Sequence, residues 1–178
     1  MMKLPATPAD FLREAVDPGL ALLPSKLDSI EARVWLTTIA LQESALAHRW
    51  QIVDARDPSK KGPARGLLQF ELGSEASRGG VWGVYLHWGT QGLLKWACDT
   101  RGVQFEPRAI WEALESDDAL AVALGRLLML TDPYPLPAPG DVDAGWEMYA
   151  HRLWRPGRPH FDTWPGNHEA ALRALDIT

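Results

Sequence analysis

The chain has 178 residues, of which 46% are apolar and 23% charged, which is typical of a compact globular domain and excludes a disordered or collagen-like chain. Acidic residues outnumber basic residues by 23 to 18, and the net charge of −5 makes the chain as a whole a poor electrostatic partner for nucleic acid. No apolar run reaches the roughly 18 residues that a membrane-spanning helix needs.

Helical signals dominate the first 47 residues. Thr7 followed by Pro8 predicts an N-cap and a first-turn proline, which open a short helix ending near Val16, where Asp17-Pro18-Gly19 should stop it. This helix belongs to a short N-terminal helical arm, residues 1–24. A longer helix is expected from about Ser25 to Ala47, because that stretch contains no Gly or Pro and carries two adjacent apolar stripes. Two stripes are typical of a broadly buried helix at the centre of a fold.

The periodicity disappears after residue 47. Residues 48–63 read as a long loop or a small irregular β region, and the β element should lie near residues 50–72. Short helices with loops are then expected in a Gly- and Trp-rich region, followed by helices over about 91–99, 107–114 and 117–130, the last one capped by Ser116. A proline-rich crossing, residues 132–141, precedes helices near 142–154 and 166–175. We therefore predict one mainly α domain over residues 1–178, with a small β element.

Glu43 is the first residue that suggests chemistry. It lies near the end of the predicted buried helix, flanked by apolar residues on most sides. If it faces a cleft, desolvation should raise its pKa and keep a proton available for general-acid catalysis. A glutamate at a helix end that simply faces water is the alternative.

Two motifs in order carry a family resemblance. Leu41-Gln42-Glu43-Ser44, followed by the stretch Gly62 to Phe70 (GPARGLLQF), resembles the leading motifs of the lytic transglycosylases with a lysozyme-like fold. In that family a helix ends with a Glu-Ser pair, and an irregular loop leads into a Gly-Ala-x-Gly-Leu-Met-Gln segment. Gly66, Leu67 and Gln69 match that segment, whereas Leu68 stands where Met is usual and Pro63 is inserted. The match covers roughly residues 36–71.

The resemblance implies a lysozyme-like (α+β) fold and assigns roles to residues. Glu43 would be the catalytic acid and base, and Ser44, Gly66, Leu67 and Gln69 would contact substrate. Glycine lets the backbone approach a sugar closely, and the Gln69 amide both donates and accepts hydrogen bonds. Tyr149 is the best match for a late tyrosine that hydrogen-bonds the glutamate in the family, although a core aromatic role is nearly as well supported. An Ala-Tyr-Asn motif frequent in the family is missing, which puts the substrate subsites in doubt.

The implied reaction cleaves the β-1,4 bond between MurNAc and GlcNAc in peptidoglycan. One glutamate protonates the glycosidic oxygen, and the muramyl hydroxyl then closes onto C1 to give a 1,6-anhydro product. A two-carboxylate muramidase is the alternative, because hydrolysis needs a second Asp or Glu within about 5–9.5 Å. Asp54, Asp57 and Glu71 are the candidates for that second carboxylate. A non-catalytic structural or glycan-binding protein that keeps the fold is a further alternative.

The remaining features bear on partners and delivery. Arg152 to His160 form the one cationic stretch of an acidic chain, which either contacts peptide-stem carboxylates or another anion, or ends a helix by complementing its dipole. Cys98 is the only cysteine, the histidines show no His-Glu-x-x-His spacing and no nucleotide-binding glycine motif occurs, so we expect neither metal nor cofactor. The N-terminus lacks a secretory apolar region, so we expect cytoplasmic synthesis and then export of the phage endolysin type or packaging in a virion. The expected partner is the peptidoglycan glycan strand, not nucleic acid, and the oligomeric state is left open.

Overall fold

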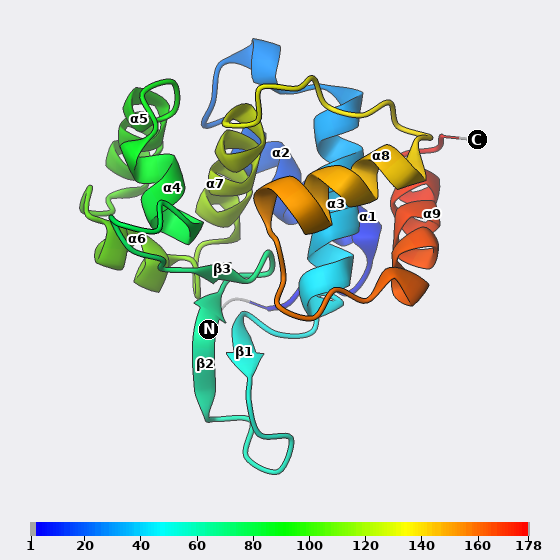
Figure 1. Ribbon diagram of the computed structural model, residues 1–178, viewed down its shortest axis with the longest axis horizontal. Helices are drawn as coiled ribbons and strands as arrows, with labels where there is room; N and C mark the ends of the chain where they lie inside the picture. The colour runs from blue at the N-terminus through cyan, green and yellow to red at the C-terminus, as the bar shows by residue number, and fades with distance from the viewer. Residues whose placement is uncertain (1–2, 178) are drawn as a thin grey trace.

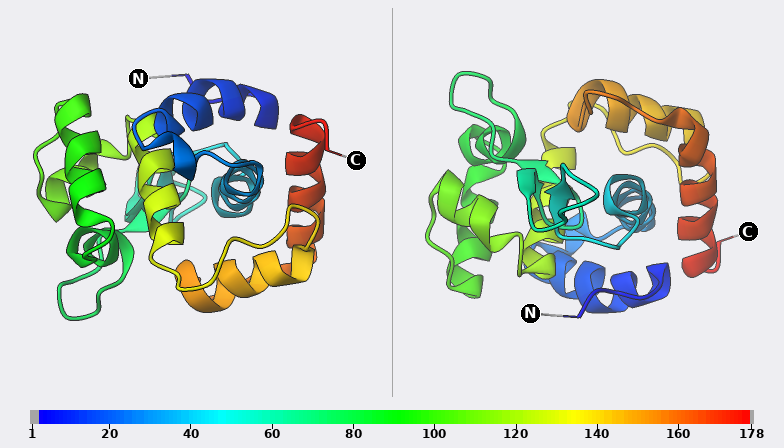
Figure 2. Two further views of the ribbon diagram at one scale, coloured as in Figure 1. Left: turned by 90° about the horizontal axis from the view of Figure 1, so that it is seen from above. Right: turned by 90° about the horizontal axis from the view of Figure 1, so that it is seen from below.

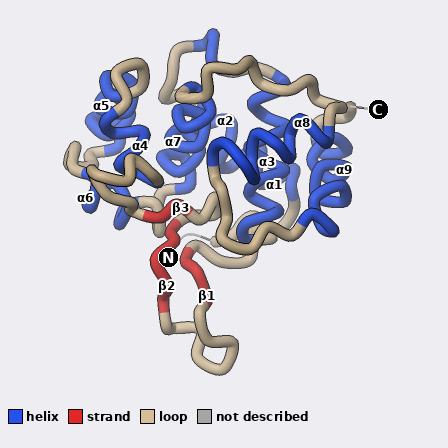
Figure 3. The backbone as a smooth tube through the Cα atoms, in the orientation of Figure 1, coloured by secondary structure: helices blue, strands red, loops and turns tan. Residues whose placement is uncertain are grey.

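The computed structural model of the protein describes residues 3–177, which form a mainly helical structure with a small three-stranded antiparallel sheet (Figures 1 and 3). The predicted mainly α class with a small β element is therefore confirmed. Buried apolar side chains from the N-terminal helices to the C-terminal helix form one continuous cluster, so the predicted N-terminal arm packs onto the rest of the molecule. Within residues 3–177 no helix is long and apolar enough to cross a membrane.

The N-terminal arm is one continuous helical stretch. The Thr7 hydroxyl caps α1 (Pro8–Phe11) by accepting a hydrogen bond from the backbone N–H of Asp10. A π-helical turn (Leu12–Val16) then runs directly into α2 (Asp17–Leu20). The prediction that Asp17-Pro18-Gly19 ends the helix near Val16 is thus wrong. The wider π turn, marked by the bond from Asp17 N–H to the Leu12 carbonyl, accommodates Pro18, whose ring would otherwise clash one turn earlier.

The central helix is α3 (Ile30–Ser44), which Figure 2 shows end-on with the other long helices arranged around it. It is shorter than the predicted 25–47. Residues Ser25–Leu27 form a separate 3₁₀ turn, and the Ser29 side chain caps α3 by accepting from Ala32 N–H. At the other end Ala45 and Leu46 both adopt left-handed φ angles of 48° and 58°, which terminates the helix. The prediction of a buried central helix is confirmed.

A β-hairpin follows α3 and protrudes from the helical body (Figure 1). Strands β1 (Trp50–Ile52), β2 (Lys61–Arg65) and β3 (Phe70–Glu71) pair in the order β1-β2-β3. A buried ion pair anchors the sheet to the core. Arg49, directly before β1, contacts Asp118 at the start of helix α7 (Asp118–Leu130), with nitrogen–oxygen distances of 2.6 and 2.8 Å. This anchor fixes where the β3 edge lies relative to the end of α3.

The remaining helices are α4 (Gly80–Leu86), α5 (Gln91–Arg101), α6 (Pro107–Ala113), α7 (Asp118–Leu130), α8 (Val142–Trp146), a π-helix η3 (Glu147–Leu153), a 3₁₀ turn (Phe161–Thr163) and α9 (Trp164–Ala174). Helices α7 and α9 pack on α3, whereas α4, α5 and α6 lie on the far side of α7 (Figure 2). Helix α7 is capped by the Asp117 side chain, which accepts from Leu120 N–H, and not by the predicted Ser116. The tryptophans divide between core and surface: Trp35 and Trp164 are fully buried, whereas Trp88 is 91% exposed.

Stacked aromatic rings join α3, η3 and α9. The Trp35 and Trp164 rings are parallel with centroids 6.1 Å apart, and the Tyr149 ring stacks on Trp164 at 4.9 Å. The helix α8 approaches this stack through Gly145, where a Cβ would lie 2.2 Å from the Trp35 ring. The absence of a side chain at residue 145 therefore lets α8 and the following η3 pack close to the central helix.

Substituting this glycine should destabilise the protein more than substituting another helical glycine. In Gly145→Ala the new methyl group clashes with a rigid buried ring, and we expect a loss of at least about 1–3 kcal/mol in the free energy of unfolding. Gly166→Ala in α9 is the matched control, because nothing lies within 4 Å of the added Cβ, and it should gain about 0.5–1 kcal/mol from helix propensity. Urea unfolding followed by circular dichroism measures both, and equal effects would contradict the close packing of α8.

Candidate functional site

Glu43 and Tyr149 meet at the end of α3. The Tyr149 hydroxyl donates a 2.8 Å hydrogen bond to Oε1 of Glu43, so the contact expected from the resemblance is present. Tyr149 lies in η3, is only 3% exposed and is held by the aromatic stack described above. Since a buried tyrosine hydroxyl needs a partner, this bond satisfies both groups and fixes the orientation of the carboxyl.

The environment of Glu43 raises the pKa of its carboxyl to about 7 from an ordinary value of 4.5. Burial is the main cause, because removing water disfavours the charged carboxylate. The hydrogen bond from Tyr149 acts in the opposite direction, and the negative charge of Glu71 adds to the increase. At neutral pH a large fraction of Glu43 therefore keeps its proton, as a general acid requires.

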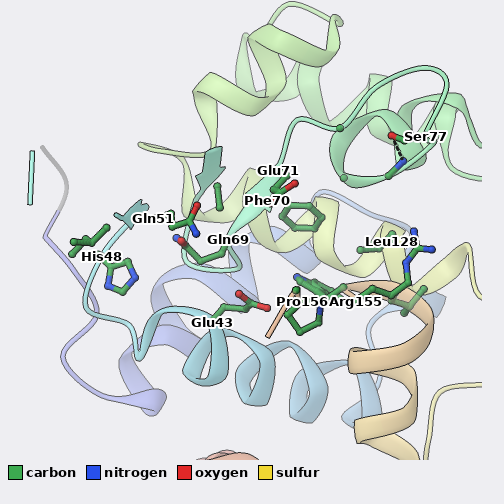
Figure 4. A pocket seen from close by; sticks show the side chains of 18 residues that line it. Glu43, His48, Gln51, Gln69, Phe70, Glu71, Ser77, Leu128, Arg155 and Pro156 are labelled. Atoms are coloured by element: carbon green, nitrogen blue, oxygen red, sulfur yellow. Dashed lines mark hydrogen bonds between the residues drawn. The ribbon is translucent and has the colours of Figure 1, made fainter. Parts of the chain in front are cut away.

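A cleft of about 620 Å³ opens above Glu43 (Figure 4). Its walls come from segments far apart in the chain: the end of α3, the β-sheet, the loop at 73–80, the end of α7 and the segment 153–157. Figure 4 shows the Glu43 carboxyl pointing into this space, with Gln69 and Glu71 on the opposite wall. His48 lies at one end of the cleft and Arg155 at the other.

Of the three residues that match the Gly-Leu-x-Gln segment, the structure brings one to the cleft. Gln69 lines it with a left-handed φ of 51°, and its amide nitrogen donates to the Gly66 carbonyl at 2.7 Å. Gly66 and Leu67 are buried instead. Gly66 has φ of 75° and a Cβ there would approach the Leu114 carbonyl at 3.1 Å, so this glycine serves a tight turn against the α6–α7 connection. The structure does not support their predicted substrate contacts; these residues shape the turn that presents Gln69.

Ser44 also differs from the prediction. Its hydroxyl donates to the Ala40 carbonyl at 3.0 Å and accepts from Leu46 N–H at 3.2 Å, and the residue is 2% exposed. It therefore contacts neither the Glu43 carboxyl nor the cleft. The helix turns the side chain that follows Glu43 into the core, where it satisfies backbone groups at the C-terminus of α3.

Of the three candidate second carboxylates, one lines the cleft and two do not. Glu71 lines the cleft across from Glu43 and its charge acts on the Glu43 carboxyl. Asp54 and Asp57 lie in the hairpin loop and do not line the cleft. They accept hydrogen bonds within that loop, Asp54 from Arg56 N–H and Asp57 from Ser59. Of the three candidates, Glu71 is therefore the one that shares the cleft with Glu43.

Several parts of the cleft were not expected from the sequence. His48, just before β1, and Gln51, within β1, line it, and the glycine-rich loop at 73–80 forms one wall. Trp154, which belongs to the cationic stretch noted in the sequence, forms another wall, and its indole N–H donates to the Leu68 carbonyl in the turn before β3 at 3.0 Å. The available signals were the loss of periodicity after residue 47 and the density of glycines after residue 72, which mark irregular backbone but not which side faces a cleft.

Among the described residues 3–177, no three His, Cys, Asp or Glu side chains lie close enough together to hold a metal ion. Cys98 is buried, and burial raises the pKa of its thiol to about 11, which makes it a poor nucleophile. Comparison of the chain with protein-family models, with curated proteins and with solved structures finds no match. The chemistry of the site therefore has to be inferred from its own residues.

The pKa of Glu43 should respond in opposite directions to changes at its two neighbours. Tyr149→Phe removes the hydrogen bond that stabilises the carboxylate, so the pKa should rise above about 7. Glu71→Gln removes a repelling charge, so the pKa should fall below that value. Carbon-13 NMR titration of the glutamate carboxyls measures both shifts. Glu75→Gln is the control, because this exposed carboxylate lies outside the cleft, and the same shift in all three variants would contradict the electrostatic account.

The raised pKa also predicts how stability depends on pH. Between pH 4.5 and about 7 the folded protein retains a proton on Glu43 that the unfolded chain releases, so the carboxyl destabilises the fold progressively as pH rises through this window. Glu43→Gln removes that effect. The free energy of unfolding of Glu43→Gln relative to the parent should therefore increase by about 1–3 kcal/mol as the pH rises from 4.5 to 8. Urea unfolding at each pH measures this difference. A difference that does not change with pH would contradict the prediction.

Proposed function

We propose that the protein has a lysozyme-like fold and is a lytic transglycosylase, which cleaves the MurNAc–GlcNAc β-1,4 bond of peptidoglycan glycan strands. The observation that carries the proposal is the Glu43 carboxyl, pointing into a cleft with its pKa raised to about 7 and bound by Tyr149. The resemblance of residues 36–71 to the family's leading motifs supports it, because the same residues supply the acid and the Gln69 wall.

The first step is breakage of the glycosidic bond. Glu43 transfers its proton to the bridging oxygen as the bond to C1 breaks, and the leaving sugar departs with a neutral hydroxyl. Glu43 is then a carboxylate, and the Tyr149 hydroxyl stabilises its charge through the 2.8 Å hydrogen bond. Gln69, on the facing wall, is placed to hydrogen-bond the sugar.

The second step closes the ring. The carboxylate of Glu43 takes the proton from the C6 hydroxyl of the muramyl sugar, whose oxygen forms the new bond to C1. The product is a 1,6-anhydromuramyl end, and Glu43 is protonated again for the next cycle. This sequence needs one protein carboxylate.

Hydrolysis by two carboxylates is the second candidate, and the position of Glu71 favours it. Glu71 lines the cleft opposite Glu43, so it is placed to activate a water molecule or to stabilise positive charge at C1. The product would then be a reducing muramyl end. Asp54 and Asp57 contribute nothing to this candidate, because they lie in the hairpin loop away from the cleft.

Mass spectrometry of the products from purified peptidoglycan distinguishes the candidates. We expect anhydromuramyl ends from the parent protein and a decrease of about 10²–10⁴-fold in the rate for Glu43→Gln, because the proton donor is lost. For Glu71→Gln we expect the same product with a rate optimum at lower pH, because the pKa of Glu43 falls.

Glu75→Gln serves as the matched control and should behave as the parent. Reducing muramyl ends that vanish in both Glu43→Gln and Glu71→Gln would instead establish a two-carboxylate hydrolase. No soluble product from the folded parent would overturn both enzymatic candidates and leave a structural or glycan-binding protein.

A further inference from the structure

A second cavity of about 230 Å³ adjoins the far end of the cleft. The two share Gly79, Gly80, Leu128, Leu153 and Arg155 as lining residues, so a ligand in the cleft can reach from one into the other. Figure 4 shows Arg155 and Leu128 at this junction, at the end of the cleft opposite His48. The roles proposed above for Glu43, Gln69 and Tyr149 do not use this cavity.

Its charged lining has one sign. Arg78, Arg152 and Arg155 line the cavity, and no carboxylate of residues 3–177 does. Arg152 is paired with the buried Asp132, whose carboxylate accepts from its Nε at 2.8 Å. Arg78 and Arg155 pair with no carboxylate in the described part of the chain, and both are exposed. In a chain of net charge −5 this is a local concentration of unpaired positive charge.

Arg78 is held in place by tight backbone packing. Its N–H donates to the Ser74 carbonyl at 3.0 Å, and its own φ is 49°. A Cβ on Gly83 of helix α4 would lie 2.5 Å from the Arg78 carbonyl, so the loop rests directly on that helix. At the base of the same loop a Cβ on Gly73 would lie 1.9 Å from the Gly79 carbonyl. The loop therefore presents Arg78 from a fixed backbone.

Arg155 is tied to the candidate catalytic pair. Its N–H donates to the Tyr149 carbonyl at 3.1 Å, and the Trp154 N–H donates to the same carbonyl at 3.0 Å. The hydroxyl of that same Tyr149 binds Glu43. Arg155 has a left-handed φ of 47°, which turns the chain out of the π-helix at the edge of the cleft. The backbone that carries Arg155 thus has a defined position relative to Glu43.

His87 adds a hydrogen-bond donor on the α4 side. Its Nδ1 accepts from the Gly89 N–H at 3.2 Å, so the neutral ring carries its proton on Nε2. The cavity therefore offers guanidinium groups and an imidazole N–H, which are donors, and it lacks acidic acceptors among the described residues. Such a set suits a carboxylate or a phosphate, and planar guanidinium groups bind carboxylates in a two-point geometry.

We propose that Arg78 and Arg155 of this cavity bind a carboxylate of the peptide stem, which branches from the muramyl residue in the adjoining cleft. The inference rests on the proposed action on peptidoglycan. Sugar rings of the glycan supply hydroxyl and N-acetyl groups to the cleft, whereas the stem that branches from the muramyl residue ends in carboxylates. The protein would thus select strands that still carry their peptides.

Cleavage of stem-bearing glycan and of the same glycan with its stem carboxyl groups amidated provides the test. We expect the parent to have the higher kcat/KM on the strands whose stem carboxylates are free. The double variant Arg78→Gln/Arg155→Gln should reduce the ratio of the two kcat/KM values by about tenfold, mainly through KM, because a charge-assisted contact is lost.

Two control variants isolate the charge at this cavity. Arg158→Gln removes an exposed arginine from the same segment that lines neither cavity, and it should leave the ratio unchanged. Arg78→Lys/Arg155→Lys keeps the charge and should retain most of the selectivity. A parent that cuts both substrates equally, or a double variant that slows both to the same extent, would overturn the inference while leaving the proposed function intact.

Binding measured in the absence of cleavage tests the cavity assignment independently of the proposed function. In the Glu43→Gln background, soluble fragments with free stem carboxylates should bind more tightly than fragments with amidated stems, and substitution of both arginines should abolish the difference. That result, together with a parent protein that cleaves no peptidoglycan, would support the cavity assignment and reject the proposed function. The free stem peptide should compete, and its carboxyl-amidated form should not. Stronger competition by inorganic phosphate would instead assign the cavity to a phosphate-bearing wall polymer and overturn the carboxylate assignment.

Discussion

The hydrogen bond between Tyr149 and Glu43 is the interaction on which the rest of the site depends. It joins residues that are 106 positions apart in the chain, one at the end of the central helix and the other in the π-helix η3. Neither group would be stable alone at this depth, because a desolvated carboxyl and a buried phenol each need a partner. Burial and Glu71 raise the pKa of Glu43 while the phenol limits the rise, so the carboxyl remains able both to release and to recover a proton near neutral pH.

The π-helical geometry of η3 connects this pair to the cleft walls. The Tyr149 carbonyl accepts two N–H groups, from Trp154 and Arg155, which ends the helix and turns the chain toward the cleft. The Trp154 indole then donates to Leu68, in the turn that carries Gln69. Tyr149 and its immediate neighbours thus link Glu43, the wall that carries Gln69 and the end of the cleft that carries Arg155. A helical segment with five-residue hydrogen bonds at a functional position is a recurrent feature of proteins, since it displaces a side chain without breaking the helix.

The helical class and the central helix could be predicted from the sequence, because they depend on local signals. The candidate site residues came from the family resemblance: the Glu-Ser pair and the Gly-Leu-x-Gln segment pointed to Glu43 and Gln69, and the late tyrosine of the family pointed to Tyr149. The structure brings these three residues together around one cleft. Ser44 follows Glu43 in the motif but does not reach the cleft, because consecutive residues of a helix point about 100° apart and Ser44 turns into the core. The cationic cavity was not predictable in full, since Arg78 and Arg155 come from segments whose relative position depends on tight glycine contacts.

Electrostatics explains why positive charge and acid occupy opposite parts of the same groove. A guanidinium beside Glu43 would stabilise the carboxylate, lower its pKa and remove the proton that the proposed first step needs. The groups that act on Glu43 are its apolar surroundings, Tyr149 and Glu71, and no arginine is among them. Arg78 and Arg155 lie at the far end, where they can bind an anion without lowering the pKa of Glu43. The loop at 73–80 and the turn after η3 maintain that separation, so the proposed substrate recognition and the proposed proton transfer can coexist in one continuous cleft.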